Sequence, residues 1–269
     1  MCVIAVASAK RGTGKTTAAL SLAAALAELP DGLSTVLIDL DPCGDATRRM
    51  GVAREKTLLR ALLDGRRNVG DVAGSFTVLH AVHPTAERFA IVPSSDDIGE
   101  VEARFAKMRG GTELLIDRLR SLGRECHIVI DTAPGITSFL GRAAIVAADI
   151  VIIPVFPEPG ADRRVIEVVN LLRGMGGGGE VFVVAAQANG NGSDVDVLND
   201  GLRDDHLTVC EWFLPEPSIA HSTSSIGTPL LLAPASQCAA SYRSLARKVH
   251  AELVEQRSLA LLQHSRLPV

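Results

Sequence analysis

A glycine-containing loop near the N-terminus constrains the fold of this chain more than any other feature. The loop, residues 9–17, follows a short apolar run at residues 2–7 and precedes an Ala- and Leu-rich run at residues 17–29. Glycines let successive backbone N–H groups turn toward one anion, and the N-terminus of the next helix adds the positive end of its dipole. This order of strand, loop and helix predicts a phosphate-binding P-loop.

The residue types in the loop have distinct expected roles. Lys15 would reach the β- and γ-phosphates of a nucleotide, and the Thr16 hydroxyl would bind Mg²⁺. The other loop positions would contact the phosphates mainly through backbone N–H groups: Arg11, Gly12, Thr13, Gly14 and Thr17.

The spacing of the loop departs from the common form G-x-x-x-x-G-K-[ST], because Ala9 stands at the first glycine position. A second lysine, Lys10, lies five residues before Lys15. This pattern resembles the deviant Walker A loop, K-G-G-x-G-K-[ST], of the ParA/MinD superfamily, with Arg11 at the first glycine of that pattern. The resemblance implies a SIMIBI-like P-loop NTPase.

Two acidic residues mark the end of the second expected strand. Residues 34–39 end in Asp39, and Asp41 follows two positions later. Carboxylates at the carboxyl end of a buried parallel strand face the ligand site, and Mg²⁺ with its waters would offset the cost of burying them. The segment resembles the ParA switch I, D-x-D-P-Q-G-N-A, with Cys43 and Asp45 at the Gln and Asn positions. The resemblance implies that Asp41 positions the attacking water and that Asp39 supports the magnesium shell.

A third apolar strand ends in Asp131. Residues 128–130 are apolar, as in a Walker B strand, and the carboxylate that follows would bind a magnesium-ligated water. The next residues, Thr-Ala-Pro-Gly, resemble the switch II motif of the same superfamily. Gly135 can offer its backbone N–H close to a γ-phosphate because no side chain stands in the way.

Two weaker segments extend the resemblance to the C-terminus. Residues 152–159 resemble the ParA segment I-P-V-Q-P-E, and residues 222–246 resemble its late loop and the helix that follows. In the superfamily this loop frames the adenine, which implies base contacts from Thr223 and Ser224, although Ser224 replaces the family proline. Gln187, just after a strand end, is another candidate for the base, and an ordinary polar loop residue is the alternative.

Alternating apolar runs and helical patterns predict an α/β fold: a doubly wound, mostly parallel sheet with helices on both faces. Expected strands are residues 2–8, 34–39, 90–93, 126–131, 150–154, 180–186 and 208–212, and expected helices are residues 16–29, 57–63, 97–106, 111–122, 138–147, 162–173, 193–204 and 236–262. A glycine run, residues 174–179, is interpreted as a flexible connector. We find no repeat and no composition break, and therefore expect one P-loop ATPase domain over residues 1–269.

Composition narrows the class further. Hydrophobic residues make up 47% and charged residues 22%, an ordinary balance for a soluble globular protein. The net charge of −4 argues against a strongly basic nucleic-acid protein. Five cysteines without a C-x-x-C pair indicate reduced thiols in a cytoplasmic protein rather than a zinc site or a disulfide framework. Neither a signal peptide nor a membrane span is expected.

The resemblance implies a weak, partner-stimulated ATP hydrolase that uses ATP and Mg²⁺ and forms a homodimer with ATP. In the superfamily the lysine matching Lys10 crosses the dimer interface to the partner's phosphates; the alternative is an exposed lysine without a partner. The cargo would be a plasmid, a chromosome or a protein assembly, and the partner a ParB-like or cargo adaptor protein with a basic N-terminal segment.

Non-specific DNA binding is a further implication, and it would associate the protein with the nucleoid. The basic residues that are candidates for it are Arg203, Arg243, Arg247, Lys248 and Arg257. The alternative for those near the C-terminus is the solvated face of the last helix.

Three other functions fit parts of the chain. A MinD-like membrane-associated regulator would need a basic amphipathic C-terminal helix, whereas residues 252–267 carry mixed charges and no lysine. An iron–sulfur reductase would need a cysteine soon after Asp131, and the sequence has none there. A nucleotide-binding switch with little hydrolysis is favoured by Arg11, which would either narrow the loop or add a phosphate contact.

Overall fold

One seven-stranded sheet forms the centre of the computed structural model, which describes residues 2–30, 33–54, 58–67, 88–124, 126–186, 192–203, 207–212 and 235–264. The strand order is β3-β2-β4-β1-β5-β6-β7, and every pairing within it is parallel. The strands are β1 (Cys2–Val6), β2 (Thr35–Asp39), β3 (Phe89–Val92), β4 (His127–Asp131), β5 (Ile150–Val155), β6 (Glu180–Ala186) and β7 (Thr208–Trp212).

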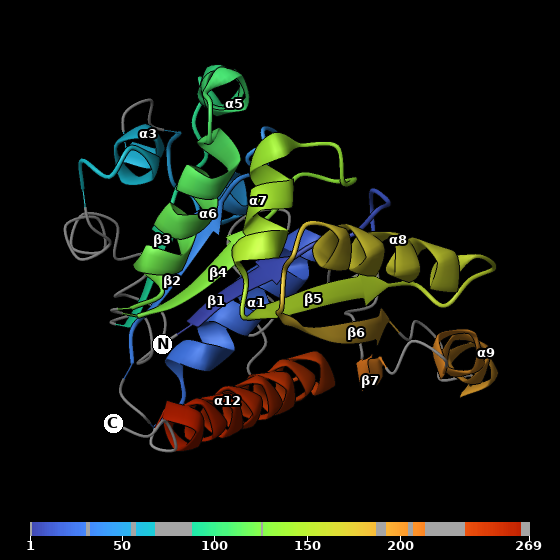
Figure 1. The fold of residues 1–269 in the computed structure, drawn as a ribbon. Helices are drawn as coiled ribbons and strands as arrows, with labels where there is room; N and C mark the ends of the chain where they lie inside the picture. The colour runs from blue at the N-terminus through green and yellow to red at the C-terminus, as the bar shows by residue number, and fades with distance from the viewer. Residues whose placement is uncertain are drawn as a thin grey trace.

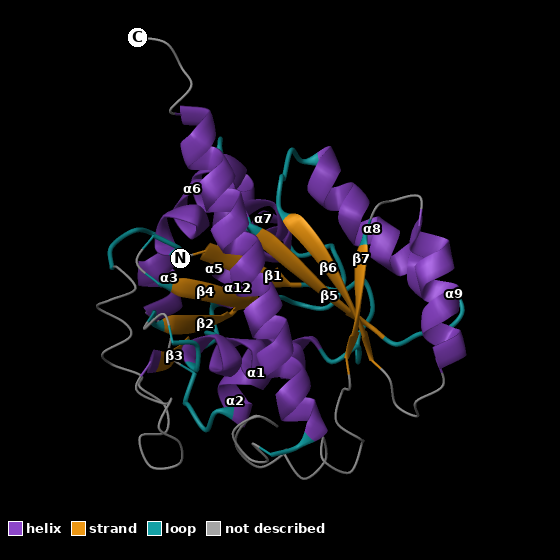
Figure 2. Ribbon diagram, turned by 90° about the horizontal axis from the view of Figure 1, so that it is seen from below, coloured by secondary structure: helices purple, strands orange, loops and turns teal. Residues whose placement is uncertain are grey.

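Helices cover both faces of this sheet (Figure 1). One face carries α1 (Lys15–Ala27), α2 (Asp45–Arg49) and α12 (Gln237–His264). The other carries α3 (Leu58–Leu63), α5 (Ile98–Lys107), α6 (Gly111–Leu122), α7 (Phe139–Ala147), α8 (Ala161–Gly174) and α9 (Gly192–Leu202). Figure 2, seen from below, shows α12 lying along α1 under the strands. The expected doubly wound α/β fold is confirmed.

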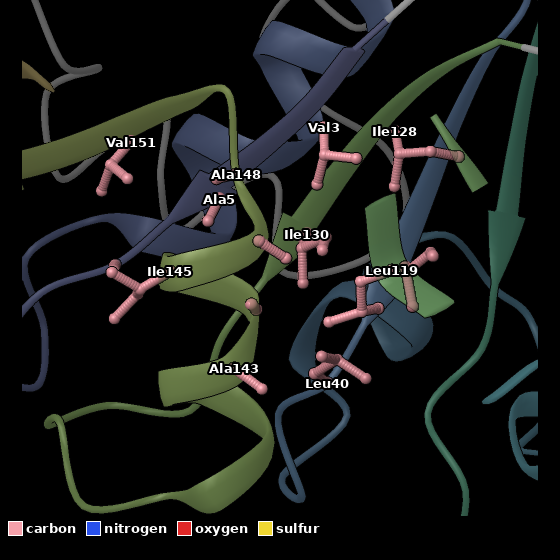
Figure 3. Close-up of a cluster of buried hydrophobic side chains, with 14 of the residues drawn as sticks. Val3, Ala5, Leu40, Leu119, Ile128, Ile130, Ala143, Ile145, Ala148 and Val151 are labelled. Atoms are coloured by element: carbon pink, nitrogen blue, oxygen red, sulfur yellow. The ribbon is translucent and has the colours of Figure 1, made fainter. Parts of the chain in front are cut away.

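The strands are apolar throughout because both of their faces are buried. In β1, Val3 and Ala5 pack into one core cluster, which includes Ile130 of β4, while Ile4 and Val6 pack into the other. Figure 3 shows part of the first cluster, where side chains from the strands meet those of α6 and α7. With few aromatic residues available, small and aliphatic side chains fill both layers.

The expected strands and helices lie within two residues of the observed ones, and the sequence analysis missed only α2 among the described helices. This helix has five residues, which is too short to show a helical period of apolar positions. Among the described residues, no helix is both long and apolar enough to span a membrane.

The glycine run at residues 174–179 connects the end of α8 to the amino end of β6, away from the carboxyl ends of the strands. It is not a second phosphate loop. The Gly177 amide donates to the Leu172 carbonyl at 2.8 Å. A Cβ on Gly179 would lie 2.5 Å from the Ala148 carbonyl oxygen, so glycine is required there by close backbone approach.

Gly179→Ala is expected to destabilise the protein by about 1–3 kcal/mol, because backbone atoms must move to admit the methyl group. Gly178→Ala is the matched control, since a Cβ at Gly178 meets nothing within 4 Å. Urea unfolding of both variants measures the difference. Equal stability of the two variants would show that the connector yields freely.

Candidate functional site

Three loops meet at the carboxyl edge of the sheet because β2, β4 and β1 are neighbours in it. They are residues 7–14 after β1, residues 40–44 after β2 and residues 132–138 after β4. Asp39 and Asp131 are partners in the register of β2 and β4, so the two carboxylates lie side by side at this edge. Open α/β sheets bind their ligands at this edge, where adjacent strands connect to opposite faces.

The loop before α1 is shaped by glycines at positive φ. Gly12 has φ of 77° and Gly14, the residue at the start of α1, has φ of 85°. Both conformations are costly for residues with a side chain. Gly14, the N-cap residue of α1, has no side chain to bond the amides of the first turn, which can therefore face an anion.

A pocket of about 300 Å³ lies against this loop. Several expected site residues line it: Arg11, Gly12, Gly14, Lys15, Thr16, Thr17 and Asp41. The lining also includes residues for which the sequence analysis predicted no role in binding: Cys43, Asp45, Arg49, Pro134 and Phe156. The volume is at the small end of the range for ligand pockets.

Asp131 is fully buried, and neither of its carboxylate oxygens has a regular hydrogen bond within the described part of the chain. Burial raises the pKa of Asp131 well above its usual range, and the Asp39 carboxylate adds to this effect. The Thr16 hydroxyl and the Lys15 ammonium act in the opposite direction. Such a buried carboxylate is stabilised by a cation with open coordination positions.

Asp131 and its neighbours Asp39 and Thr16 fit Mg²⁺. They present carboxylate and hydroxyl oxygens, and oxygen ligands are those that this ion prefers. No cluster of three or more His, Cys, Asp or Glu residues able to hold a metal occurs among the described residues. Mg²⁺ usually takes one or two protein carboxylates and completes its shell with water and phosphate oxygens.

Asp39 has partners for both of its oxygens. Oδ2 accepts from the hydroxyl and the amide of Thr47 at 2.7 and 2.9 Å, and Oδ1 accepts from the Asp41 amide at 3.1 Å. Burial raises the pKa of Asp39 to about 6, while the bonds from Thr47 counteract this shift. Asp39 therefore holds the loop after β2 in place, in addition to any contact with a magnesium shell.

Asp41 lies at the pocket wall with its backbone fixed. Its Oδ1 accepts from the Cys43 amide at 2.8 Å, and its carbonyl accepts from the Ser94 hydroxyl at 2.8 Å. Arg54 donates to the carbonyls of Pro42 at 2.7 Å and Ser95 at 3.0 Å, so it joins this loop to the segment after β3. The sequence analysis missed Ser94 and Arg54, because neither belongs to a motif and each bonds to a residue 41 or more positions away.

The two lysines of the loop lie in different surroundings. Lys15 is 7% exposed, and its Nζ lies 3.4 Å from the Lys10 carbonyl oxygen. Burial lowers the pKa of Lys15, while the Asp131 and Asp41 carboxylates counteract this shift. Lys10 extends outward, and its Nζ pairs with Glu158 Oε1 at 2.7 Å. The same oxygen accepts from Arg164 at 2.7 Å.

Five other residues were expected to contact the nucleotide: Thr13, Gly135, Gln187, Thr223 and Ser224. The hydroxyl of Thr13 is directed at the Lys10 carbonyl at 3.5 Å, behind the pocket. Gly135 has φ of 84°, and its amide donates to the Ser8 carbonyl at 3.0 Å, so it would have to leave this bond to reach a phosphate. Gln187, Thr223 and Ser224, the candidates for the base, lie outside the described residues.

Most of the basic residues considered for DNA are engaged within the chain. Arg243 donates to Glu28 at 2.6 and 3.1 Å and is half-buried, which removes it as a DNA candidate. Arg203 pairs with Asp200 at 2.7 Å, and Lys248 lies 5.5 Å from the ring centre of Phe182. Arg247 is exposed on α12, and the side chain of Arg257 lies outside the described part.

Comparison with known proteins gives one family match and many relatives. The AAA_31 family model, described as an AAA domain, matches residues 1–175. The chromosome partitioning protein ParA of Myxococcus xanthus is 32% identical over 156 residues, which are 56% of this chain and 51% of that protein. The chromosome-partitioning ATPase Soj of Thermus thermophilus is 36% identical over 155 residues, 58% of this chain and 55% of that protein. The chain thus spans about half the length of these curated relatives.

Solved structures resemble the whole described fold. McdA of Cyanothece in complex with ATP has a TM-score of 0.74 at 19% identity, covering 92% of this chain and 96% of that one. The septum site-determining protein MinD of Pyrococcus horikoshii, complexed with Mg-ADP, has a TM-score of 0.69 at 23% identity, covering 92% and 95%. At these identities the likeness establishes the fold.

Proposed function

Because the chain belongs to the ParA/Soj/MinD family of deviant Walker A ATPases, we propose that it dimerises on ATP and hydrolyses it to position or partition a cargo. The cargo would be plasmid or chromosomal DNA, or a protein assembly. We propose further that residues 1–269 act as one ATPase domain in the cytoplasm, with a ParB-like or adaptor partner that stimulates hydrolysis. The observation that carries the proposal is the buried carboxylate of Asp131 beside Lys15, at the uncapped start of α1.

The proposed ATP site follows from the charges around the pocket. The amides of the loop and of the first turn of α1 would hold the phosphates, and the Lys15 ammonium would neutralise their charge. Thr16 and Asp131 would hold Mg²⁺, which supplies charge neutralisation between the β- and γ-phosphates when bound. Asp39 would support the same shell and keep the switch I loop, residues 39–47, in register through Thr47.

Hydrolysis requires a water molecule in line with the γ-phosphate. Asp41 lines the pocket with its Oδ1 bonded to the Cys43 amide, and its backbone is fixed by Ser94. A carboxylate held this firmly can orient the attacking water, which is most of what phosphoryl transfer demands of a protein. We therefore assign this role to Asp41.

The proposed dimer assigns a second role to the loop. Lys10 is half-exposed at the rim of the site and pairs with Glu158, which is itself exposed. Because both side chains are in contact with solvent, exchanging Glu158 for the phosphates of a second protomer costs little. Lys10 would then bind across the interface to the ATP of the partner subunit.

Lys15→Ala and Asp41→Ala should separate binding from hydrolysis. Lys15→Ala loses the cation that faces the phosphates, so its affinity for ATP should fall about 30-fold or more. Asp41→Ala should keep ATP and the dimer, while turnover falls about 100-fold. Equilibrium ATP binding and phosphate release measure the two effects. Normal ATP affinity of Lys15→Ala, or unchanged turnover of Asp41→Ala, would contradict the assignment concerned.

Lys10→Ala should abolish the ATP-induced dimer while ATP binding to the monomer remains. Light scattering after size-exclusion chromatography, with and without ATP, measures this change. Lys107→Ala is the matched control, since Lys107 is an exposed lysine at the end of α5. Glu158→Gln should dimerise at least as readily as the wild type because it frees Lys10. A full dimer with Lys10→Ala would refute the cross-interface role.

ATP-dependent DNA binding should weaken steeply with salt, since counterion release drives it. Arg247→Ala should reduce the salt slope by about 1 if this side chain neutralises one phosphate. Arg109→Ala is the control, because Arg109 is an exposed arginine between α5 and α6, on the opposite face of the sheet. Mobility shift assays at several salt concentrations measure the slope, and a shift independent of ATP would argue against this part of the proposal.

A further inference from the structure

Among the described residues, Arg49 lines the pocket without a carboxylate to balance its guanidinium. Arg49, the last residue of α2, donates from NH1 to the Thr17 hydroxyl at 2.9 Å. Both residues line the pocket. The hydrogen bonds and ion pairs found for Arg49 within the described part of the chain include no acidic partner.

Three other partly buried arginines are balanced by carboxylates, whereas Arg88 and Arg118 donate to carbonyl or hydroxyl oxygens within the described part of the chain. Arg54, Arg104 and Arg243 each pair with a carboxylate, at Asp96, Asp64 and Glu28 respectively. The nearest acid on the same helix is Asp45, one turn earlier, and Asp45 pairs with Arg48 at 2.9 Å. A half-buried cation next to a neutral hydroxyl is stabilised by an anionic ligand.

The charges of the pocket wall point the same way. Arg11, Lys15 and Arg49 are cations, whereas Asp41 and Asp45 are the acids of the wall, and Asp45 is already neutralised by Arg48. The wall therefore favours a ligand with several negative charges. A guanidinium also offers donors in a planar fork that matches phosphate oxygens.

The position of Thr17 indicates which phosphate Arg49 meets. Lys15 reaches toward the β- and γ-phosphates, and Thr17 lies two residues further along, in the first turn of α1. A guanidinium anchored on the Thr17 hydroxyl is therefore placed at the end of the nucleotide away from the site of cleavage. One N–H of Arg49 is used on Thr17, and within the described part of the chain its remaining donors are open to a ligand.

We propose that Arg49 is a phosphate-binding residue that holds the α-phosphate of the nucleotide from α2, beside the Thr17 hydroxyl. The proposal rests on the proposed ATP site and adds a contact that comes from the helix directly after switch I. The contact would link α2 to α1 through the bound nucleotide. Because ADP and ATP both carry an α-phosphate, it would strengthen the binding of both.

The test is equilibrium binding of ATP and ADP to the wild type, Arg49→Ala, Arg49→Lys and Arg109→Ala. We expect Arg49→Ala to weaken both nucleotides by a similar factor, about 10-fold or more. Arg49→Lys, which keeps the charge but not the fork, should lie between it and the wild type. Arg109→Ala is the matched control and should bind as the wild type does, because Arg109 is an exposed arginine between α5 and α6 and does not line the pocket.

The other possible results contradict either this inference alone or the proposed function with it. Unchanged affinity of Arg49→Ala for both nucleotides, with normal binding by the wild type, would overturn this inference alone. A loss for ATP without a loss for ADP would move the contact to the γ-phosphate and overturn it as well. A wild type without affinity for ATP would overturn the proposed function together with this inference. Thermal melting without nucleotide excludes a folding defect, and Arg49→Lys decides the matter if Arg49→Ala unfolds.

Discussion

The site depends on one buried carboxylate that has no regular hydrogen bond within the described part of the chain. Asp131 ends a central strand that is covered on both faces, so its oxygens have almost no solvent exposure. A second carboxylate, Asp39, is its partner in the sheet register and increases the electrostatic cost. Lys15 and Thr16, from the first turn of α1, are the groups that offset this cost. The position of α1 thus brings Lys15 and Thr16 to the buried carboxylates at the carboxyl edge of the sheet.

A separate hydrogen-bond network fixes the loop after β2. Thr47 donates its hydroxyl to Asp39, and the same hydroxyl oxygen accepts from the Ser94 amide at 2.8 Å. The Ser94 hydroxyl in turn donates to the Asp41 carbonyl. The edge strand β3 therefore contributes to the site through the segment that follows it. This network keeps Asp41 at the pocket wall before any nucleotide arrives.

Local patterns in the sequence predict much of this arrangement. Lys15, Asp39 and Asp131 could be assigned because each ends or follows a buried strand at a fixed spacing, and parallel strands bring their carboxyl ends to one edge. Arg49, Arg54 and Ser94 could not, since each has a contact across 32 or more residues that no local motif encodes. Arg243 was assigned to a surface role for the same reason: its partner Glu28 is 215 residues away.

Glu158 accepts from two cations through one oxygen, and this shared arrangement bears on how a dimer could form. If Lys10 binds across the proposed dimer interface, Arg164 on α8 still balances the carboxylate. Lys10 can therefore depart without leaving an uncompensated negative charge beside the incoming triphosphate of the other subunit. Because Arg164 still pairs with Glu158, the proposed dimer would meet less repulsion between this carboxylate and the partner's triphosphate than an unpaired glutamate would cause.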